Sequence, residues 1–164
     1  MNRNYLLLFM LLCYLIPIYY VYYYYDFNHS VSNIICNDQC KYAILFFMFW
    51  MGVGTLLYEL ERNDTFTTSI IGFLLVGIYG LIYIHENNRL HYVFASIALI
   101  SILGFMIRQC YVAQCDSILQ ASLILEIILL LRILAKVNKA NIFYDEILYI
   151  INFALYYLYL HFIQ

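Results

Sequence analysis

The sequence predicts an all-α fold, a polytopic bundle of about six membrane-spanning helices, on three observations. Of the 164 residues, 66% are hydrophobic and only 11% are charged, and the mean hydropathy is +0.82. Soluble domains carry about 25% charged residues, and one of this length could not keep so much apolar surface from water. The charges lie mostly in short clusters. The runs between them do not alternate in polarity as barrel strands would, whereas helices satisfy their backbone hydrogen bonds internally, as lipid requires.

The apolar runs have the length of membrane spans. About 20 mostly apolar residues, rising about 1.5 Å each, cross the hydrocarbon core. Six segments fit this length: 5–25, 42–60, 66–84, 90–107, 117–135 and 146–163. Short connections make neighbouring helices antiparallel. Nothing remains for a second domain, so residues 1–164 are expected to form a single transmembrane domain.

Small and polar residues recur at helical spacing within the segments. In lipid, helices associate through close packing of small residues and through polar contacts. We therefore expect these faces to be helix–helix contacts rather than a pathway for substrate. Two of the faces are Ser69, Gly72 and Gly80 in the third segment, and Tyr149, Asn152 and Tyr156 in the sixth.

Glu126 lies at the centre of the fifth segment, where a carboxylate costs at least about 2.5 kcal/mol on insertion scales. On its helix face only Ser122 could hydrogen-bond to it, and Arg132 lies on another face. Without a nearby cation, we expect Glu126 to be protonated for much of the time. We favour a neutral acid that joins two helices over an exchangeable carboxyl of a proton- or cation-coupled site. Glu59, in the second segment, completes this candidate intramembrane polar site.

Three basic residues follow one another at helical spacing near the end of the fifth segment. Arg132, Lys136 and Lys139 stand at positions i, i+4 and i+7 and form a basic stripe. Cations at a membrane surface are attracted to anionic headgroups. We therefore expect these residues to contact lipid headgroups and to anchor the helix.

Histidines, cysteines and acids gather at one face of the predicted bundle. They are His29, His85, Glu86, His91, Cys36, Cys40, Asp145 and Glu146. These residue types bind zinc, but the spacing around His91 is not HExxH, which places two imidazoles on one helix face. Interfacial histidines and loop acids are the simpler interpretation. We expect no metal, no cofactor and no catalytic residues.

The orientation of the chain in the membrane stays open. The loops after the first, third and fifth helices hold more basic residues than the opposite side, which by the positive-inside rule places both termini outside the cytoplasm. However, a glycosylation sequon at Asn28 lies on this basic side, and a second at Asn63 lies on the other. Two cysteine pairs also lie at opposite faces, so at most one should meet an oxidising compartment. The pairs are Cys36 with Cys40 and Cys110 with Cys115.

One short motif suggests a family. Six helices with short connections, a third helix that ends in Ile84-His85-Glu86, and a fourth that opens with His91-Tyr92-Val93-Phe94-Ala95 resemble the DRAM-like family of damage-regulated autophagy modulators. The family's segment with Ser/Asp and Pro-Glu before the second helix is missing, and residues 34–40 stand there instead. The resemblance implies a non-enzymatic, multi-spanning protein of endomembranes with cytosolic termini.

The sequence favours a structural or regulatory protein of an unidentified membrane over a catalyst. Its expected partners are the lipid bilayer and other membrane proteins or further copies of itself. The net charge of −2 offers no basic field for nucleic acid, which is not expected as a partner. The first alternative is a small proton- or cation-coupled transporter or channel that uses Glu126. The second is an intramembrane, metal-dependent hydrolase.

Overall fold

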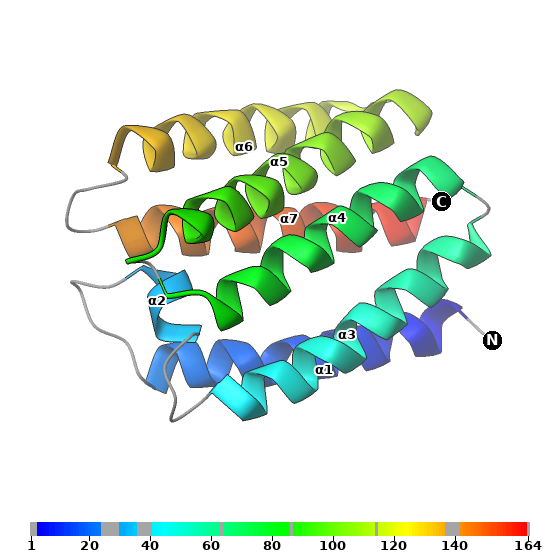
Figure 1. The fold of residues 1–164 in the computed structure, drawn as a ribbon. Helices are drawn as coiled ribbons and strands as arrows, with labels where there is room; N and C mark the ends of the chain where they lie inside the picture. Colours follow the sequence, from blue (N-terminus) through cyan, green and yellow to red (C-terminus); the bar gives the residue numbers. More distant parts are fainter. Residues whose placement is uncertain are drawn as a thin grey trace.

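The computed structural model is helical, with no strand among the residues it describes. These residues are 3–23, 30–35, 41–62, 64–85, 87–113, 115–136 and 142–163. Their helices are α1 (Arg3–Tyr23), α2 (Val31–Ile35), α3 (Lys41–Glu61), α4 (Thr65–Tyr83), α5 (Arg89–Val112), α6 (Ser117–Lys136) and α7 (Ile142–Ile163) (Figure 1). By length and composition, six of them, all but α2, could cross a membrane. The predicted all-α bundle of membrane-spanning helices is therefore confirmed.

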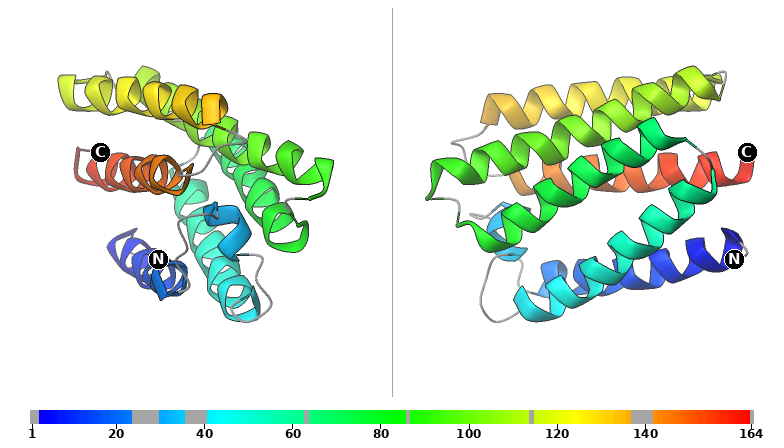
Figure 2. Two further views of the ribbon diagram at one scale, coloured as in Figure 1. Left: turned by 90° about the vertical axis from the view of Figure 1, so that its left-hand side faces the viewer. Right: turned by 45° about the vertical axis from the view of Figure 1, so that its right-hand side comes forward.

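The six long helices lie side by side, and successive ones run in opposite directions (Figure 2). α1 packs closely on α3, α4 on α5, and α6 on α7. α3 joins the first pair to the second through α4, and α5 joins the second pair to the third through α6. α1 begins and α7 ends at the same end of the bundle, which we call the terminal end. α2 lies at the opposite end, which we call the α2 end.

Two helices extend past the charged residues at which the sequence placed their ends. α5 continues to Val112 instead of ending at 107, and α7 begins at Ile142 instead of 146. The reason is that polar side chains here point into the bundle. Gln109 and Asp145 are each 1% exposed and have partners on neighbouring helices. A polar cluster with such partners does not mark a helix end. The other predicted boundaries lie within two residues of the observed ones.

The sequence also missed α2, which lies where a loop was predicted. Val31 and Ile34 are buried against Val21 of α1 and Phe143 of α7. The hydroxyl of Ser30 accepts a hydrogen bond from the backbone N–H of Asn33 at 3.1 Å, which supports the first turn. A single amphipathic turn is too short for the helical repeat to be recognised, so this element could not be predicted from periodicity.

Short polar residues begin the helices at both ends of the bundle. Asp64 caps α4 and Asn88 caps α5, each accepting hydrogen bonds from backbone N–H groups of the first turn. Asp116 does the same for α6 by accepting from the N–H of Leu119 at 2.8 Å. This hydrogen bond and one from the hydroxyl of Tyr159 lower the pKa of Asp116. The polar clusters between the spans therefore act as helix caps.

α4 and α5 come closest at Gly77. A Cβ atom there would lie 2.7 Å from the backbone nitrogen of Ala98, closer than real Cβ atoms come. Gly80 is likewise covered by an aromatic ring of α5. The predicted contact face of α4 was Ser69, Gly72 and Gly80. It is right for Gly80 but wrong for the other two residues, because Ser69 is exposed and a Cβ on Gly72 would meet nothing within 4 Å. The contacting face is centred on Gly77 instead.

Replacing Gly77 by alanine should destabilise the bundle. The added methyl group would force α5 away from α4, and overpacking of this kind costs about 1–3 kcal/mol. Thermal unfolding of the purified protein in detergent would show a lower midpoint for Gly77→Ala. Gly72→Ala is the matched control in the same helix, and it should leave the midpoint unchanged or raise it, since alanine is the better helix former by about 1 kcal/mol. Equal effects of the two substitutions would contradict the close contact.

Candidate functional site

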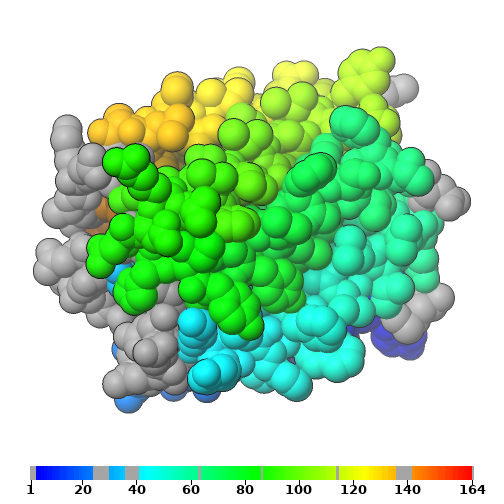
Figure 3. Space-filling model, in the orientation of Figure 1, coloured from blue at the N-terminus to red at the C-terminus, as the bar shows by residue number. Residues whose placement is uncertain are grey.

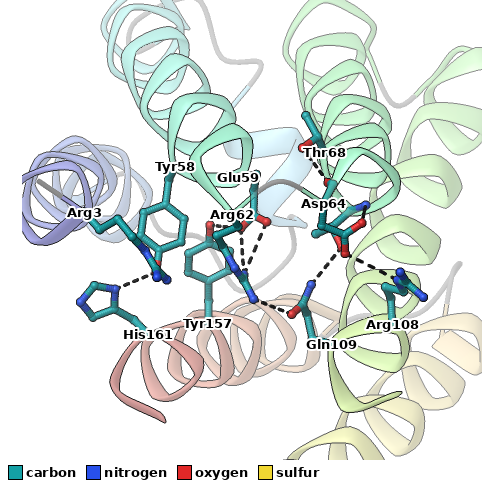
Figure 4. Close-up of polar contacts among 11 residues, drawn as sticks. Arg3, Tyr58, Glu59, Arg62, Asp64, Thr68, Arg108, Gln109, Tyr157 and His161 are labelled. Atoms are coloured by element: carbon teal, nitrogen blue, oxygen red, sulfur yellow. Dashed lines mark hydrogen bonds and ion pairs between the residues drawn. The ribbon is translucent and has the colours of Figure 1, made fainter. Parts of the chain in front are cut away.

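A polar network at the terminal end connects five of the long helices (Figure 4). At its centre, Glu59 of α3 is fully buried. Its Oε1 accepts a hydrogen bond from the hydroxyl of Tyr157 on α7 at 2.5 Å, and it lies 3.3 Å from Nη1 of Arg62, which follows α3. Glu59, a predicted polar candidate, is thus a buried carboxylate that has both a cation and a hydroxyl as partners.

The guanidinium of Arg62 extends this network to α5 and α4. Its Nη2 donates to Oε1 of Gln109 at 2.7 Å, and Nε2 of Gln109 donates to the hydroxyl of Thr67 at 3.0 Å. That hydroxyl donates to Asp64 at 2.5 Å, and Arg108 lies 3.6 Å from the same carboxylate. Partial burial raises the pKa of Asp64, but the hydrogen bonds from Thr67 and the charge of Arg108 outweigh it and lower the pKa. The contacts therefore connect α3, α4 and α5 in one chain.

A second branch connects α1 to α3 and α7. Arg3 donates to the hydroxyl of Tyr58 at 3.1 Å and lies 5.1 Å from the centre of its ring. Nε2 of His161 lies 3.1 Å from Oδ1 of Asn4, which can only accept, so this nitrogen carries the proton. In the neutral imidazole Nδ1 then accepts from the hydroxyl of Tyr58, 2.7 Å away. Both ends of the described chain are thus joined at the same place.

Glu126, the other predicted candidate, lies between α6 and α7. It is fully buried, and its Oε2 accepts a hydrogen bond from Nδ2 of Asn152 at 2.5 Å. The same nitrogen donates to the backbone oxygen of Ser122 at 2.9 Å, while the Ser122 hydroxyl donates to Oδ1 of Asn152 at 2.8 Å. Asn152 therefore brings Glu126 and Ser122 together. Among the described residues, Oε1 of Glu126 has no hydrogen-bond partner.

The structure describes only part of the predicted basic stripe. Nη2 of Arg132 forms an ion pair with Oδ1 of Asp145 at 2.9 Å, and 57% of the arginine side chain is exposed. Lys136 ends α6, but its side chain lies outside the described residues, as does all of Lys139. Contact of the three residues with lipid headgroups stays a prediction. Arg132 has, in addition, a structural role in joining α6 to α7.

His91 is buried and occupied by contacts within the protein. Its Nδ1 donates to the carbonyl oxygen of Ile84 at 2.6 Å, which leaves Nε2 to accept from the hydroxyl of Ser32 at 3.0 Å. It therefore holds α2 against α5. Within the described part of the chain, no three His, Cys, Asp or Glu side chains gather in a way that could hold a metal ion. Outside that part lie His29, Cys36, Cys40 and Glu86.

A cavity of about 270 Å³ runs along the inside of the bundle, between α1, α3, α4, α5 and α7. It is lined almost wholly by apolar side chains. From α1 alone, residues from Leu7 to Val21 line it, which at 1.5 Å per residue makes it about 21 Å long. The few polar side chains that reach it include Ser32 and Glu146 at the α2 end and Tyr157 toward the terminal end. The cavity is thus a long apolar slot with polar ends.

The cavity is partly open, and the exposed side chains in its lining belong to α1. Toward the terminal end Leu7 packs in one cluster with Leu158, and toward the α2 end Val21 packs with residues of α2 and α7. Between these clusters, Leu11 and Ile18 line the cavity and yet are 36% and 39% exposed. On the face formed by α3, α4 and α5, side chains cover the interior (Figure 3). The opening therefore faces sideways, where the middle of a bilayer would be.

Cys110 and Cys115 form a disulfide at the terminal end, where α5 ends and α6 begins. Their Cα atoms are 4.4 Å apart. Cys13 is a buried free cysteine, and the second predicted pair, Cys36 and Cys40, lies outside the described residues. Of the two pairs that the sequence left open, the structure therefore pairs the one at the terminal end.

Sequence reasoning found both buried glutamates but missed most of their partners. Gln109 and Tyr157 were not singled out, and Asn152 was placed on a contact face without its link to Glu126. The available signal was the rarity of amides within apolar helices, since a buried amide requires hydrogen-bond partners. The cavity has no comparable signal, because apolar residues that line a void look like those that fill a core.

Removing the cation beside Glu59 should destabilise the protein strongly. Arg62→Ala leaves a buried carboxylate without its charge partner, which costs about 3–5 kcal/mol. Replacing both residues, in Glu59→Met with Arg62→Met, removes the charge as well and should recover most of that loss. Thermal unfolding in detergent compares the two variants. A double variant no more stable than Arg62→Ala would show that the ion pair is not what holds this end together.

Comparison with known proteins assigns no family to the chain. No family model, no curated protein and no solved structure matches the chain. The resemblance to the DRAM-like family therefore stays a prediction from the short motif around His91. The features that bear on function are the polar network, the α6–α7 contact and the apolar cavity.

Proposed function

We propose that this chain is a multi-pass integral membrane protein without catalytic activity, which acts by holding the acyl chain of a membrane lipid inside its helix bundle. The observation that carries the proposal is the apolar cavity between α1, α3, α4, α5 and α7. It lies among helices that are long and apolar enough to span a bilayer, where lipid is the surrounding solvent.

The size of the cavity argues for an occupant. Protein interiors are close-packed, because atoms that line an empty void lose dispersion contacts. The relation measured for closed cavities in a soluble protein core is about 24 cal/mol per Å³, so 270 Å³ that was closed and empty would cost on the order of 6 kcal/mol. Water would not relieve this cost, since a lining of Leu, Ile and Met offers it few hydrogen bonds. An apolar occupant would restore the lost dispersion contacts.

The shape of the cavity argues for an acyl chain. A slot about 21 Å long and parallel to the helices has the form of an extended hydrocarbon chain rather than of a compact ligand. It is open beside Leu11 and Ile18 of α1, at the depth where lipid tails lie. Polar groups that reach its ends include Ser32 and Tyr157, and both already hydrogen-bond within the protein. The arrangement favours binding over chemistry.

Filling the cavity should abolish lipid binding. Ala154 lines the cavity, and Ala154→Phe would place a ring inside it. The probe is cis-parinaric acid, a fluorescent fatty acid, titrated into protein purified in a detergent without an acyl chain. The wild type should bind it saturably, and Ala154→Phe should bind at least about tenfold more weakly, a loss of about 1.4 kcal/mol.

The control is Ala121→Phe, which makes the same change at an exposed position of α6 outside the cavity lining. It should bind the probe as the wild type does. Equal binding by all three proteins, or a sterol as the sole lipid that co-purifies with the wild type, would contradict the acyl-chain proposal.

We further propose that the terminal end faces an oxidising compartment and the α2 end the cytoplasm. The disulfide between Cys110 and Cys115 at the terminal end supports this orientation, because such bonds persist outside the reducing cytosol. The positive-inside rule supports it independently. The α2 end holds Lys41, Arg89, Arg132 and Lys136, and in the sequence Lys139 follows α6, against Arg3, Arg62 and Arg108 at the terminal end. This orientation is opposite to the one that the DRAM-like resemblance implies.

Sealed membrane vesicles of known sidedness test the orientation. A tag added after Gln164 should be cleaved by external protease only in vesicles whose non-cytoplasmic face is outside. Cys110 and Cys115 should take up iodoacetamide in the denatured protein only after reduction, which reports the disulfide separately. A tag cleaved from the cytoplasmic side would reverse the proposed orientation.

A further inference from the structure

Three carboxyl groups within the spanning helices are at most 1% exposed among the described residues, and they differ in their partners. Glu59 lies 3.3 Å from Arg62, and Asp145 lies 2.9 Å from Arg132. Within the described part of the chain Glu126 has no such cation, and an amide is its partner instead. A buried carboxylate without a cation bears the full desolvation penalty of its charge, whereas the protonated acid does not. Of the three, Glu126 is therefore the carboxyl whose charged form would have no cation beside it among the described residues.

The hydrogen bonds around Glu126 agree with a neutral acid. A carboxylate would present two charged oxygens that need donors, and the amide of Asn152 supplies a donor to Oε2 alone. That amide is held in place by Ser122, which uses its hydroxyl on Oδ1 and its backbone oxygen on Nδ2. Oε1 is buried and has no partner within the described part of the chain. This oxygen is the atom on which a proton would reside.

A groove leads from the terminal end toward this carboxyl. It has a volume of about 430 Å³ and lies between α6 and α7, with Ser122 and Asn152 among its lining residues. Tyr159, which also lines it, donates to Asp116 just before α6 begins. Along the helix, Asp116 and Ser122 are about 9 Å apart, and Glu126 is one turn deeper. Most of the other lining residues are apolar, and the groove reaches to within one helical turn of Glu126.

The opposite direction is closed. Beyond Glu126 toward the α2 end, α6 buries Leu129 and Ile133, which are 4% and 3% exposed. The ion pair of Arg132 with Asp145 follows at the end of the helix. Among the described residues, apolar packing followed by an ion pair covers this side, so the groove is the route that we infer for exchange with Glu126.

We propose that Glu126 is a proton-binding site, which exchanges its proton with the terminal side of the membrane through the groove between α6 and α7. The ligand is a proton, held on Oε1, and the hydrogen bond from Asn152 to Oε2 positions the carboxyl. The site is separate from the acyl-chain cavity, since Glu126, Ser122 and Asn152 do not line that cavity. The two proposals therefore stand or fall independently.

Few other groups that titrate lie near this site. On α7, Tyr149 faces Glu126, and its hydroxyl donates to the backbone oxygen of Leu99 on α5 at 2.7 Å. On α6 itself the flanking side chain that hydrogen-bonds is Ser122, which carries no charge. The titration of Glu126 should accordingly follow a single group rather than a coupled pair.

Dicyclohexylcarbodiimide, a lipid-soluble reagent for protonated carboxyl groups, tests the proposal. The acid adds across one C=N bond of the reagent: a carboxyl oxygen bonds to the central carbon, the carboxyl proton moves to nitrogen, and nothing leaves. The wild-type protein in lipid vesicles is treated at a series of pH values, and mass spectrometry of its peptides measures the adduct at each carboxyl. Because Glu59 and Asp145 are read in the same molecule, no variant needs to fold for the comparison.

Glu126 should be labelled, and more strongly than Glu59, because the Arg62 guanidinium lies 3.3 Å from the Glu59 carboxyl. Above its titration midpoint the labelling of Glu126 should fall about tenfold per pH unit, as the neutral fraction does. No labelling of Glu126 at any pH would show that the carboxyl is charged or shielded and would overturn the proposal. Labelling that does not change with pH would show a locked structural proton and would overturn the exchange.

Two variants add a separate check. Glu126→Gln retains an acceptor oxygen for Asn152 and should unfold at the wild-type temperature while losing the adduct from that peptide. Ser122→Ala removes the hydroxyl that holds Asn152 in place and should shift the midpoint of the labelling curve without abolishing the adduct. A Glu126→Gln peptide that still gains the mass of the reagent would place the reactive group elsewhere and refute the assignment.

Discussion

Polar groups inside the bundle have no water to bind, so their hydrogen bonds must come from neighbouring helices. This constraint determines how the helices are held together. In the middle of the bundle contacts between helices are largely apolar, and in lipid such contacts gain nothing from the exclusion of water. Specific association therefore falls to a few polar groups and to close contacts such as that of Gly77 with Ala98. Several of the polar contacts lie at the two ends of the cavity.

At the terminal end, Arg62 joins α3 to α5 through Gln109, while Tyr58 joins α1 and α3 to α7 through His161. At the α2 end, Ser32 bonds to His91 of α5, and the N–H of Val31 donates to Glu146 of α7 at 2.7 Å. Polar contacts thus hold the α1–α3 pair against the other helices at the terminal end, and they hold α2 against α5 and α7 at the α2 end. Between the two ends of the bundle these helices face one another largely with apolar side chains, and the cavity and its opening lie there.

The fold was predictable because each span must be long enough and apolar enough to cross the bilayer. Both properties can be read directly from the sequence. The positions of Glu59 and Glu126 inside helices were predictable for the same reason. Their partners were not predictable. Tyr157 reaches Glu59, and Gln109 reaches Arg62, from helices that are remote in sequence. A helical wheel shows the faces of one helix but not how that helix is aligned along its neighbours. The ends of α5 and α7 were misplaced because polar side chains were taken for helix ends, although Gln109 and Asp145 point inward.

The contrast between the two buried glutamates follows from their places along the bundle. Glu59 lies near the end of α3, where Arg62 can fold back one turn to reach it while still close to water. Glu126 lies at the middle of α6, far from either membrane surface. An arginine on the same helix could reach it only by placing its charge inside the hydrocarbon region. An ion pair is therefore available to the first position and not to the second. A neutral acid that is held by an amide meets the same demand for hydrogen bonds without a second buried charge, and it leaves one oxygen for a proton that the groove can supply or remove.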